Sequence, residues 1–153
     1  MEESIKVIVF MLNNQRYGVD VQQVMSIEKM KEITHVPGTS EFIKGIINIH
    51  GETIPVIDLK DRLQMAHTEE TELNRIIVAR VEDILVGVIV DAATDVMDIE
   101  LNVIEPAKEM RGMVHKEYVK GVAKLENELL ILLDFGQVLE VTEKEELKEV
   151  IVH

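Results

Sequence analysis

Histidine and serine side chains are the first groups to consider for chemistry, because the chain of 153 residues contains no cysteine. None of its serines, Ser4, Ser26 and Ser40, lies in a G-x-S-x-G motif that would mark a nucleophile. The histidines form neither a pair four residues apart nor an H-E-x-x-H motif, the spacings typical of zinc ligands. They are His35, His50, His67, His115 and His153. We therefore expect no metal, no cofactor and no enzymatic activity.

The charge of the chain disfavours contact with nucleic acid and with anionic lipid. It has 29 acidic and 16 basic residues, a net charge of −13, whereas both partners require clustered Lys and Arg. In a chain this acidic a solvated face accounts for most carboxylates, including the run from Glu140 to Glu149, without a catalytic pair. The partners that we expect are therefore proteins.

No stretch of the sequence predicts a membrane-spanning or secretory segment. The apolar run Val7–Leu12 follows acidic residues, whereas a signal peptide begins with a basic region and ends at a small-residue cleavage site. No apolar run approaches the roughly 18 residues that a spanning helix needs. We expect no direct membrane insertion, and the lack of cysteine is compatible with a reducing cytoplasm.

The elements that hold these side chains come from an internal repeat. The stretch FIKGIINIHGETIPVIDL, residues 42–59, aligns without a gap with YVKGVAKLENELLILLDF, residues 118–135. Gly45 meets Gly121 and Asp58 meets Asp134 in this alignment. The chain is therefore expected to contain two versions of one small unit.

A second pair of segments extends the repeat and indicates strands. Residues 8–21 align with residues 77–90, and in each copy Val- and Ile-rich runs flank a polar turn, which is typical of a hairpin. Short strands in two similar sets predict an all-β fold of two five-stranded barrels of the OB or SH3 type, packed together. Two internal lobes are expected, roughly residues 1–75 and 76–140, with possible exchange of strands between them.

Few helices are predicted. Asp58 precedes Leu59 and Leu63, an interval typical of a short capped helix. Thr142 and Glu145 have capping-box spacing, which predicts a C-terminal helix over residues 142–152. In residues 21–30 a helical turn leading into a strand would place Val24 and Ile27 inward.

Two functional interpretations remain open on these residues alone. Met110 and Met113, in a polar segment that is longer in the second copy, suit either an adaptable interface or the cap of a barrel end.

A binding module that acts through its surface fits the lack of catalytic motifs. The alternative is a small acidic β-barrel that binds a ligand or acts as an enzyme, which a deep polar pocket would favour.

With these blocks in view, Val36–Leu63 resembles the signature of CheW-type chemotaxis coupling proteins. That signature has a Val-Pro pair, then FIxG, N-L-R-G and P-V-I-D-L-R blocks. The segments YGVDVQQVMSIEKM, VGVIVDAATDVMDI and YVKGVAKLENELLILLDF are similar to other blocks of the family, in the same order. The resemblance covers nearly the whole chain, and it implies a single CheW-like domain over residues 1–153.

The resemblance implies a non-catalytic adaptor at cytoplasmic receptor arrays. Such adaptors join the regulatory domain of a CheA-type histidine kinase to the signalling tips of methyl-accepting chemoreceptors. In the family the receptor helix hairpin lies in the groove between the lobes, and kinase and ring contacts use barrel ends. The groove residues carried over by position are Val21, Val24, Gly45, His50, Gly87, Ala93 and Val96. Those carried over for kinase or ring contacts are Glu105 and Met110.

The chain departs from the family pattern at these sites. His50 replaces an Arg that in many members pairs with a Glu on the neighbouring strand, and that Glu position is Ser26 here. Glu28, two residues further along, lies on the same face of a regular strand and is an alternative partner for His50. Glu105 and Met110 stand where members of the family can have an Arg and an aromatic residue.

Overall fold

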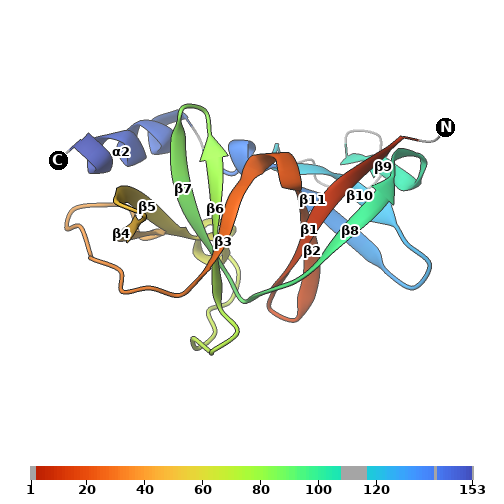
Figure 1. The fold of residues 1–153 in the computed structure, drawn as a ribbon, viewed down its shortest axis with the longest axis horizontal. Coiled ribbons are helices and arrows are strands. Elements are labelled where there is room, and N and C mark those ends of the chain that lie inside the picture. The colour runs from red at the N-terminus through yellow and green to blue at the C-terminus, as the bar shows by residue number, and fades with distance from the viewer. Residues whose placement is uncertain (1–2, 108–116, 140, 153) are drawn as a thin grey trace.

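The computed structural model describes residues 3–107, 117–139 and 141–152. These residues form two sheets that lie side by side along the long axis of the molecule (Figure 1). The six-stranded lobe has the strand order β8 (Ala92–Glu100), β1 (Ser4–Leu12), β2 (Gln15–Asp20), β11 (Leu129–Leu133), β10 (Val119–Lys124) and β9 (Ile104–Pro106). The five-stranded lobe has the order β3 (Val24–Lys29), β6 (Arg75–Val81), β7 (Ile84–Val90), β5 (Glu52–Asp58) and β4 (Ile43–Ile49).

The helices of the described residues are short, apart from one at the C-terminus. Two α-helices, α1 (Leu59–Arg62) and α2 (Val141–Val152), and the 3₁₀ turns η1 (Val21–Gln23), η2 (Leu101–Val103) and η4 (Phe135–Gln137) connect or cover the strands. The prediction of an all-β fold of two packed barrels with few helices is confirmed, but one of the two sheets has six strands where five were expected.

Each lobe takes one hairpin from the other half of the chain. The N-terminal hairpin β1–β2 pairs with β8 and β11, while the equivalent hairpin β6–β7 pairs with β3 and β5. The two parallel pairings are equivalent by the repeat, since Gly18 faces Leu132 and Gly87 faces Val56. A tight two-residue turn, Asn13 and Asn14 with φ of 50° and 67°, closes the N-terminal hairpin.

The repeated aspartates build the same local structure in both lobes. The backbone N–H of Asp58 donates to the carbonyl of Phe42 at 2.8 Å, and that of Asp134 donates to Tyr118 at 2.8 Å. The Asp58 side chain accepts from the N–H of Asp61 and so caps α1, as its position before Leu59 predicts. Asp134 caps η4 in the same way.

In each lobe the segment that follows one edge strand returns to the opposite edge of the sheet at a repeated glycine. Thr34 bridges to Ile46 in the five-stranded lobe, and β9 pairs with β10 in the six-stranded lobe. The closing backbone passes directly over the glycine that follows a bulge in β4 or β10. A Cβ atom on Gly45 would lie 2.0 Å from the Thr34 carbonyl oxygen, and one on Gly121 would lie 2.7 Å from that of Glu105.

The C-terminal helix lies against the five-stranded lobe, although it follows the last strand of the other lobe (Figure 1). Leu147 is fully buried beneath it. Glu146 accepts hydrogen bonds from the backbone and hydroxyl of Ser40, and Glu143 pairs with Arg62 at 3.1 Å. Lys148 pairs with Asp83 at 3.3 Å, and this contact raises the pKa of the Lys148 ammonium. These contacts hold the C-terminal helix against residues from the first two thirds of the chain.

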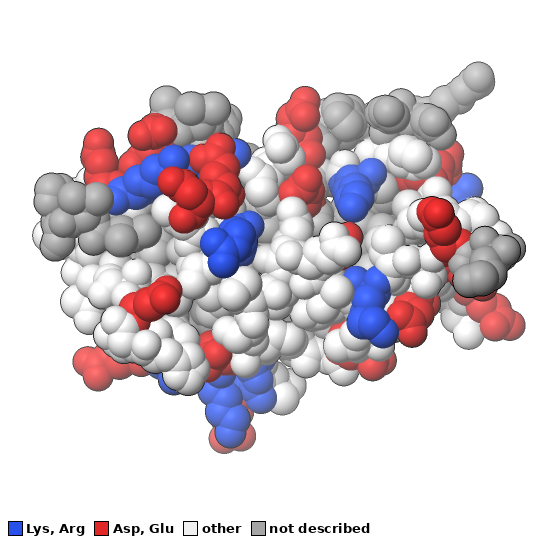
Figure 2. Space-filling view, turned by 45° about the horizontal axis from the view of Figure 1, so that its top comes forward, with Lys and Arg blue, Asp and Glu red and all other residues white. Residues whose placement is uncertain are grey.

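Lys and Arg side chains form small separate groups beside acidic ones on the face shown in Figure 2. The described ion pairs follow the same arrangement, for example Lys124 with Glu105 at 2.8 Å and Lys6 with Asp98 at 3.0 Å. The described residues of this face therefore offer nucleic acid no continuous basic surface.

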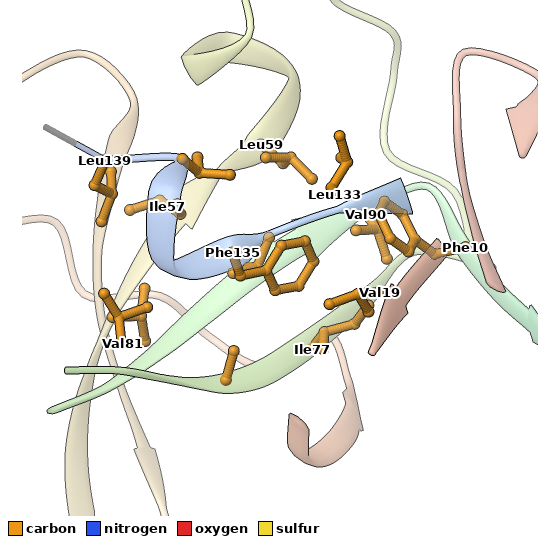
Figure 3. Packing of buried hydrophobic residues seen from close by; sticks show 14 of the residues in the cluster. Phe10, Val19, Ile57, Leu59, Ile77, Val81, Val90, Leu133, Phe135 and Leu139 are labelled. Carbon is orange, nitrogen blue, oxygen red and sulfur yellow. The ribbon is translucent and has the colours of Figure 1, made fainter. Parts of the chain in front are cut away.

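Three clusters of buried, mostly aliphatic side chains form the core. One lies inside each lobe. A larger one, part of which Figure 3 shows, draws on both sheets and includes Leu147 of α2. In the larger cluster Phe10 from β1 contacts Phe135 from η4, with ring centroids 5.7 Å apart. Because this cluster draws residues from both sheets, the two lobes share apolar surface that neither buries alone.

Candidate functional site

Two edge strands, β3 and β8, carry exposed apolar side chains on either side of the middle of the molecule (Figure 1). Met25 and Ile27 on β3 are 56% and 41% exposed, and Val96 on β8 is 55% exposed. Each strand begins where the chain crosses from one lobe to the other, β3 after η1 and β8 after Asp91. Exposed apolar side chains on both strands therefore flank the junction of the lobes.

Val21 and Val24 lie at the first crossing. The Asp20 side chain accepts from the N–H of Gln22 and starts η1, and Val24 donates to Val21 to end it. Both valines are half-buried. The expected turn leading into a strand is present, but the inward orientation predicted for Ile27 is wrong, because side chains alternate along β3 and Ile27 falls on the face opposite Val24.

Ala93 and Val96 lie on β8, which pairs with β1. Ala93 faces Phe10 and Val96 faces Ile8, with a register shift between these two pairs. Ala93 is half-buried, whereas Val96 is exposed. Of the groove residues implied by the family resemblance, Val96 thus presents the most apolar surface to a partner.

Gly45 and Gly87 are buried and belong to one rung of the five-stranded sheet. Gly45 faces Val56, Val56 faces Gly87, and the rung continues through β6 to Ser26 on β3. A Cβ atom on Gly87 would lie 2.9 Å from Ile76 Cγ2, inside van der Waals contact. These two glycines therefore allow close backbone packing inside the five-stranded lobe and offer no side chain to a partner.

His50 occupies the tight turn between β4 and β5. It has φ of 50° and Gly51 has φ of 85°, so both central residues adopt the left-handed conformation of a two-residue hairpin turn. The Asn48 side chain accepts from the N–H of Gly51 at 3.1 Å and fixes the turn. The imidazole is exposed, and the structure has no hydrogen bond or ion pair between His50 and Glu28.

Glu105 lies on β9 at the end of the six-stranded lobe. Its carboxylate pairs with Lys124 on β10 at 2.8 Å and remains partly exposed. Met110, together with Met113, lies outside the described residues. The structure therefore places one of the two residues implied for kinase or ring contacts.

The described residues offer little for catalysis or metal binding. Among them no group of three or more His, Asp or Glu side chains could hold a metal ion. A pocket of about 370 Å³ contains Asp58, Lys60 and Asp91, but Lys60 is already paired with Asp91 at 2.8 Å. Within the same described ranges, no helix is both long and apolar enough to cross a membrane.

Sequence reasoning did not single out the polar side chains at the lobe crossings. Lys60, Asp91 and Asn13 hydrogen-bond across the junction, and Gln23 bonds to Asp134 at the other crossing. The available signal was a charged residue at the end of a long apolar run, as with Asp91 after β7. Isolated charges of this kind are expected to be paired when buried.

Comparison with known proteins finds relatives that match most of the chain. A CheW-like domain matches residues 6–143. The chemotaxis protein CheW of Bacillus subtilis (strain 168) is 42% identical over 135 residues, covering 88% of this chain and 86% of the relative. That of Thermotoga maritima is 31% identical, covering 94% and 93%.

A solved structure agrees in fold as well as in sequence. The scaffolding protein TtCheW from Thermoanaerobacter tengcongensis superposes with a TM-score of 0.84 at 36% identity, covering 94% of this chain and 97% of that one. Domain match, sequence identity and fold thus each cover most of the chain. The chain belongs to the CheW family of chemotaxis scaffolding proteins.

Proposed function

We propose that this protein holds the helix hairpin of a chemoreceptor tip between β3 and β8 while a barrel end binds the regulatory domain of a CheA-type histidine kinase. Membership of the CheW family makes it an adaptor in chemotaxis signal transduction. The observation that carries the finer proposal is the apolar surface of two edge strands at the lobe junction, on Met25, Ile27 and Val96.

A helix hairpin suits this surface physically. An amphipathic helix binds by placing an apolar stripe in an apolar groove, and single exposed side chains on both walls provide such contacts. Exposed edge strands are normally protected by charge or by covering elements, whereas β3 exposes Met25 and Ile27 together. A partner that covers them would remove both from water.

The kinase contact is assigned to the end of the six-stranded lobe that carries Glu105. Glu105 lies beyond the end of β8, after η2, whereas Val96 lies in the middle of β8, so the two side chains are on different parts of the lobe. One chain can then contact receptor and kinase together without an enzymatic step. Its place is the cytoplasmic face of receptor arrays.

The test is a pair of binding titrations with purified receptor signalling tip and kinase regulatory domain. Val96→Lys should weaken receptor binding by about tenfold, because a charged side chain must be desolvated in an apolar groove. Kinase binding should be unchanged. Leu129→Lys is the matched control, since Leu129 is 63% exposed in the same lobe but lies on β11. Failure of the unmodified protein to bind either partner contradicts the proposal.

A further inference from the structure

We infer that two polar contacts, Asp91 with Lys60 and Gln23 with Asp134, are positioning devices that set the angle between β3 and β8. The consequence for receptor binding rests on the proposed function, whereas the geometry stands alone. Gln23 is the residue directly before β3, and Asp91 is the residue directly before β8. Each wall of the groove therefore begins one residue after a side chain that is bonded across the lobes.

The contact at Asp91 is centred on a buried lysine. Lys60 comes from α1 of the five-stranded lobe and is 6% exposed. Its ammonium lies 2.8 Å from Asp91 Oδ1 and donates to Asn13 Oδ1 at 3.2 Å and to the Thr68 hydroxyl. A buried ammonium needs such partners, because an unpaired charge in the interior is strongly disfavoured.

Asn13 brings the six-stranded lobe into this network. It lies in the β1–β2 turn, and its backbone N–H donates to Asp91 Oδ2 at 2.7 Å. Its side-chain amide donates to the carbonyl of Ala66 at 2.9 Å, on the segment after α1. The backbone N–H of Asp91 in turn donates to Met11 at 2.9 Å. Asp91 is thus held by both lobes through separate atoms.

In the second contact, the uncharged side chain of Gln23 binds both a carboxylate and a backbone N–H. Gln23 Nε2 donates to Asp134 Oδ1 at 2.7 Å, and Gln23 Oε1 accepts from the N–H of Phe135 at 3.2 Å. The side chain of Gln23 therefore spans from the start of β3 to the end of β11. The same aspartate caps η4, which fixes its orientation.

Hydrogen bonds and ion pairs fix the relative orientation of the two lobes more sharply than the shared apolar core does. Apolar burial around Phe10 and Phe135 is not directional, so it restricts the relative orientation of the lobes only through the close packing of the side chains. Hydrogen bonds weaken steeply when the donor–acceptor angle falls, so contacts at both crossings restrict that motion. A buried ion pair is weak support for stability but a good device for fixing one geometry.

The test measures the distance between the two walls directly. The chain contains no cysteine, so spin labels on Lys29→Cys and Asp95→Cys, exposed positions on β3 and β8, report one distance by double electron–electron resonance. Lys60→Met and Gln23→Met should each broaden this distance distribution, and Lys60→Arg should restore the narrow one. Circular dichroism verifies that every variant is folded.

A milder variant covers the case in which Lys60→Met does not fold. Asn13→Gly removes two of the cross-lobe hydrogen bonds while keeping the left-handed turn, because glycine adopts φ near 50° without strain. Asn14→Gly is its matched control, since Asn14 lies in the same turn with φ of 67° and an exposed side chain. Broadening with Asn13→Gly but not with Asn14→Gly supports the inference.

The binding readout separates this inference from the proposed function. Lys60→Met should weaken receptor binding by about tenfold and leave kinase binding unchanged. An unaltered distance distribution in folded Lys60→Met, Gln23→Met and Asn13→Gly overturns the inference. If the unmodified protein does not bind the receptor tip, the proposed function fails, and the distance distributions still decide whether the crossings position the walls.

Discussion

The two lobes use the same residues for closure and different residues for contact with the rest of the molecule. Gly45 and Gly121 follow equivalent bulges, and the aspartates at 58 and 134 make the same backbone hydrogen bond at 2.8 Å. In contrast, α2 lies against β5 of the five-stranded lobe, and the same lobe has the His50–Gly51 turn. Residues shared by the repeat build barrels, and residues that differ make the lobes distinct.

This comparison also explains why neither lobe is an independent unit. Each takes a hairpin from the other half of the chain, and Leu147 of the C-terminal helix is buried in the cluster that both lobes share. Separating the halves at residue 75 would split β3 from β6 and β1 from β8. The lobes therefore fold together, and their relative angle becomes a property that side chains can set.

Among equivalent positions of the two lobes, the closing glycines are expected to differ most in the stability that is lost on substitution. Gly45→Ala should lower the free energy of unfolding by about 4 kcal/mol, because a Cβ atom would meet the Thr34 carbonyl oxygen and φ is +144°. Gly121→Ala should cost about 2 kcal/mol, since its contact is longer at 2.7 Å. Urea unfolding of both variants measures the difference. Equal losses would mean that the two closures are equivalent after all.

The next largest effect is expected on stability, and it tests the packing of the C-terminal helix α2. Leu147→Ala should lower the free energy of unfolding by about 3 kcal/mol, because its side chain is fully buried and truncation leaves a cavity. Glu149→Ala is the control, since Glu149 is exposed on the same helix and should change stability by less than about 0.5 kcal/mol. Similar losses for both variants would show that the helix adds no specific packing.

Periodicity and repeats were sufficient to predict the barrels. The Val- and Ile-rich hairpins, the cap at Asp58 and the C-terminal helix all depend on neighbours in the sequence, and the structure has each of them. The burial of Ile27 depends instead on which face of β3 meets the core. A helical interval placed Ile27 beside Val24, whereas strand alternation separates them.

The contacts across the lobes could not be read from local patterns. Lys60 and Asp91 are 31 positions apart, and Asn13 is distant from both, so only the exchange of hairpins brings them together. The same limit applies to the groove. Spacing gives no account of why Gly87 is buried while Val96 is exposed, because the answer lies in the order of the strands.

A smaller effect concerns the turn that distinguishes the first copy. Under the proposed function, in which the family resemblance assigns His50 to the receptor groove, His50→Glu should weaken receptor binding by about tenfold, roughly 1.4 kcal/mol. A new carboxylate covered by the receptor would lose water without gaining a partner. Kinase binding should be unaffected. Glu126→Gln is the matched change in the second copy, where residue 126 aligns with His50, and it should leave both affinities unchanged. Equal loss of both partners in His50→Glu would indicate misfolding instead.

The smallest effect lies inside the six-stranded lobe, where Tyr17 stands at the position of Val86 in the repeat. Tyr17 stacks on Phe10 with ring centroids 6.0 Å apart. Burial, together with the nearby Tyr118, raises the pKa of the Tyr17 phenol above its usual value of 10.0. The folded state therefore retains this proton when the unfolded state has lost it, so the free energy of unfolding should fall as pH rises above about 10.

Tyr17→Phe isolates that contribution, because it keeps the ring packing and removes the titrating group. The variant should lose stability less steeply than the unmodified protein as the pH rises above about 10, as measured by urea unfolding at each pH. Below about pH 9 the two proteins should show the same pH dependence, since the phenol is protonated in both folded and unfolded states. Tyr118→Phe is the control, and it should reduce the slope by its effect on the pKa of Tyr17. Identical slopes in all three proteins would mean that the Tyr17 phenol reaches solvent as freely in the folded lobe as in the unfolded chain.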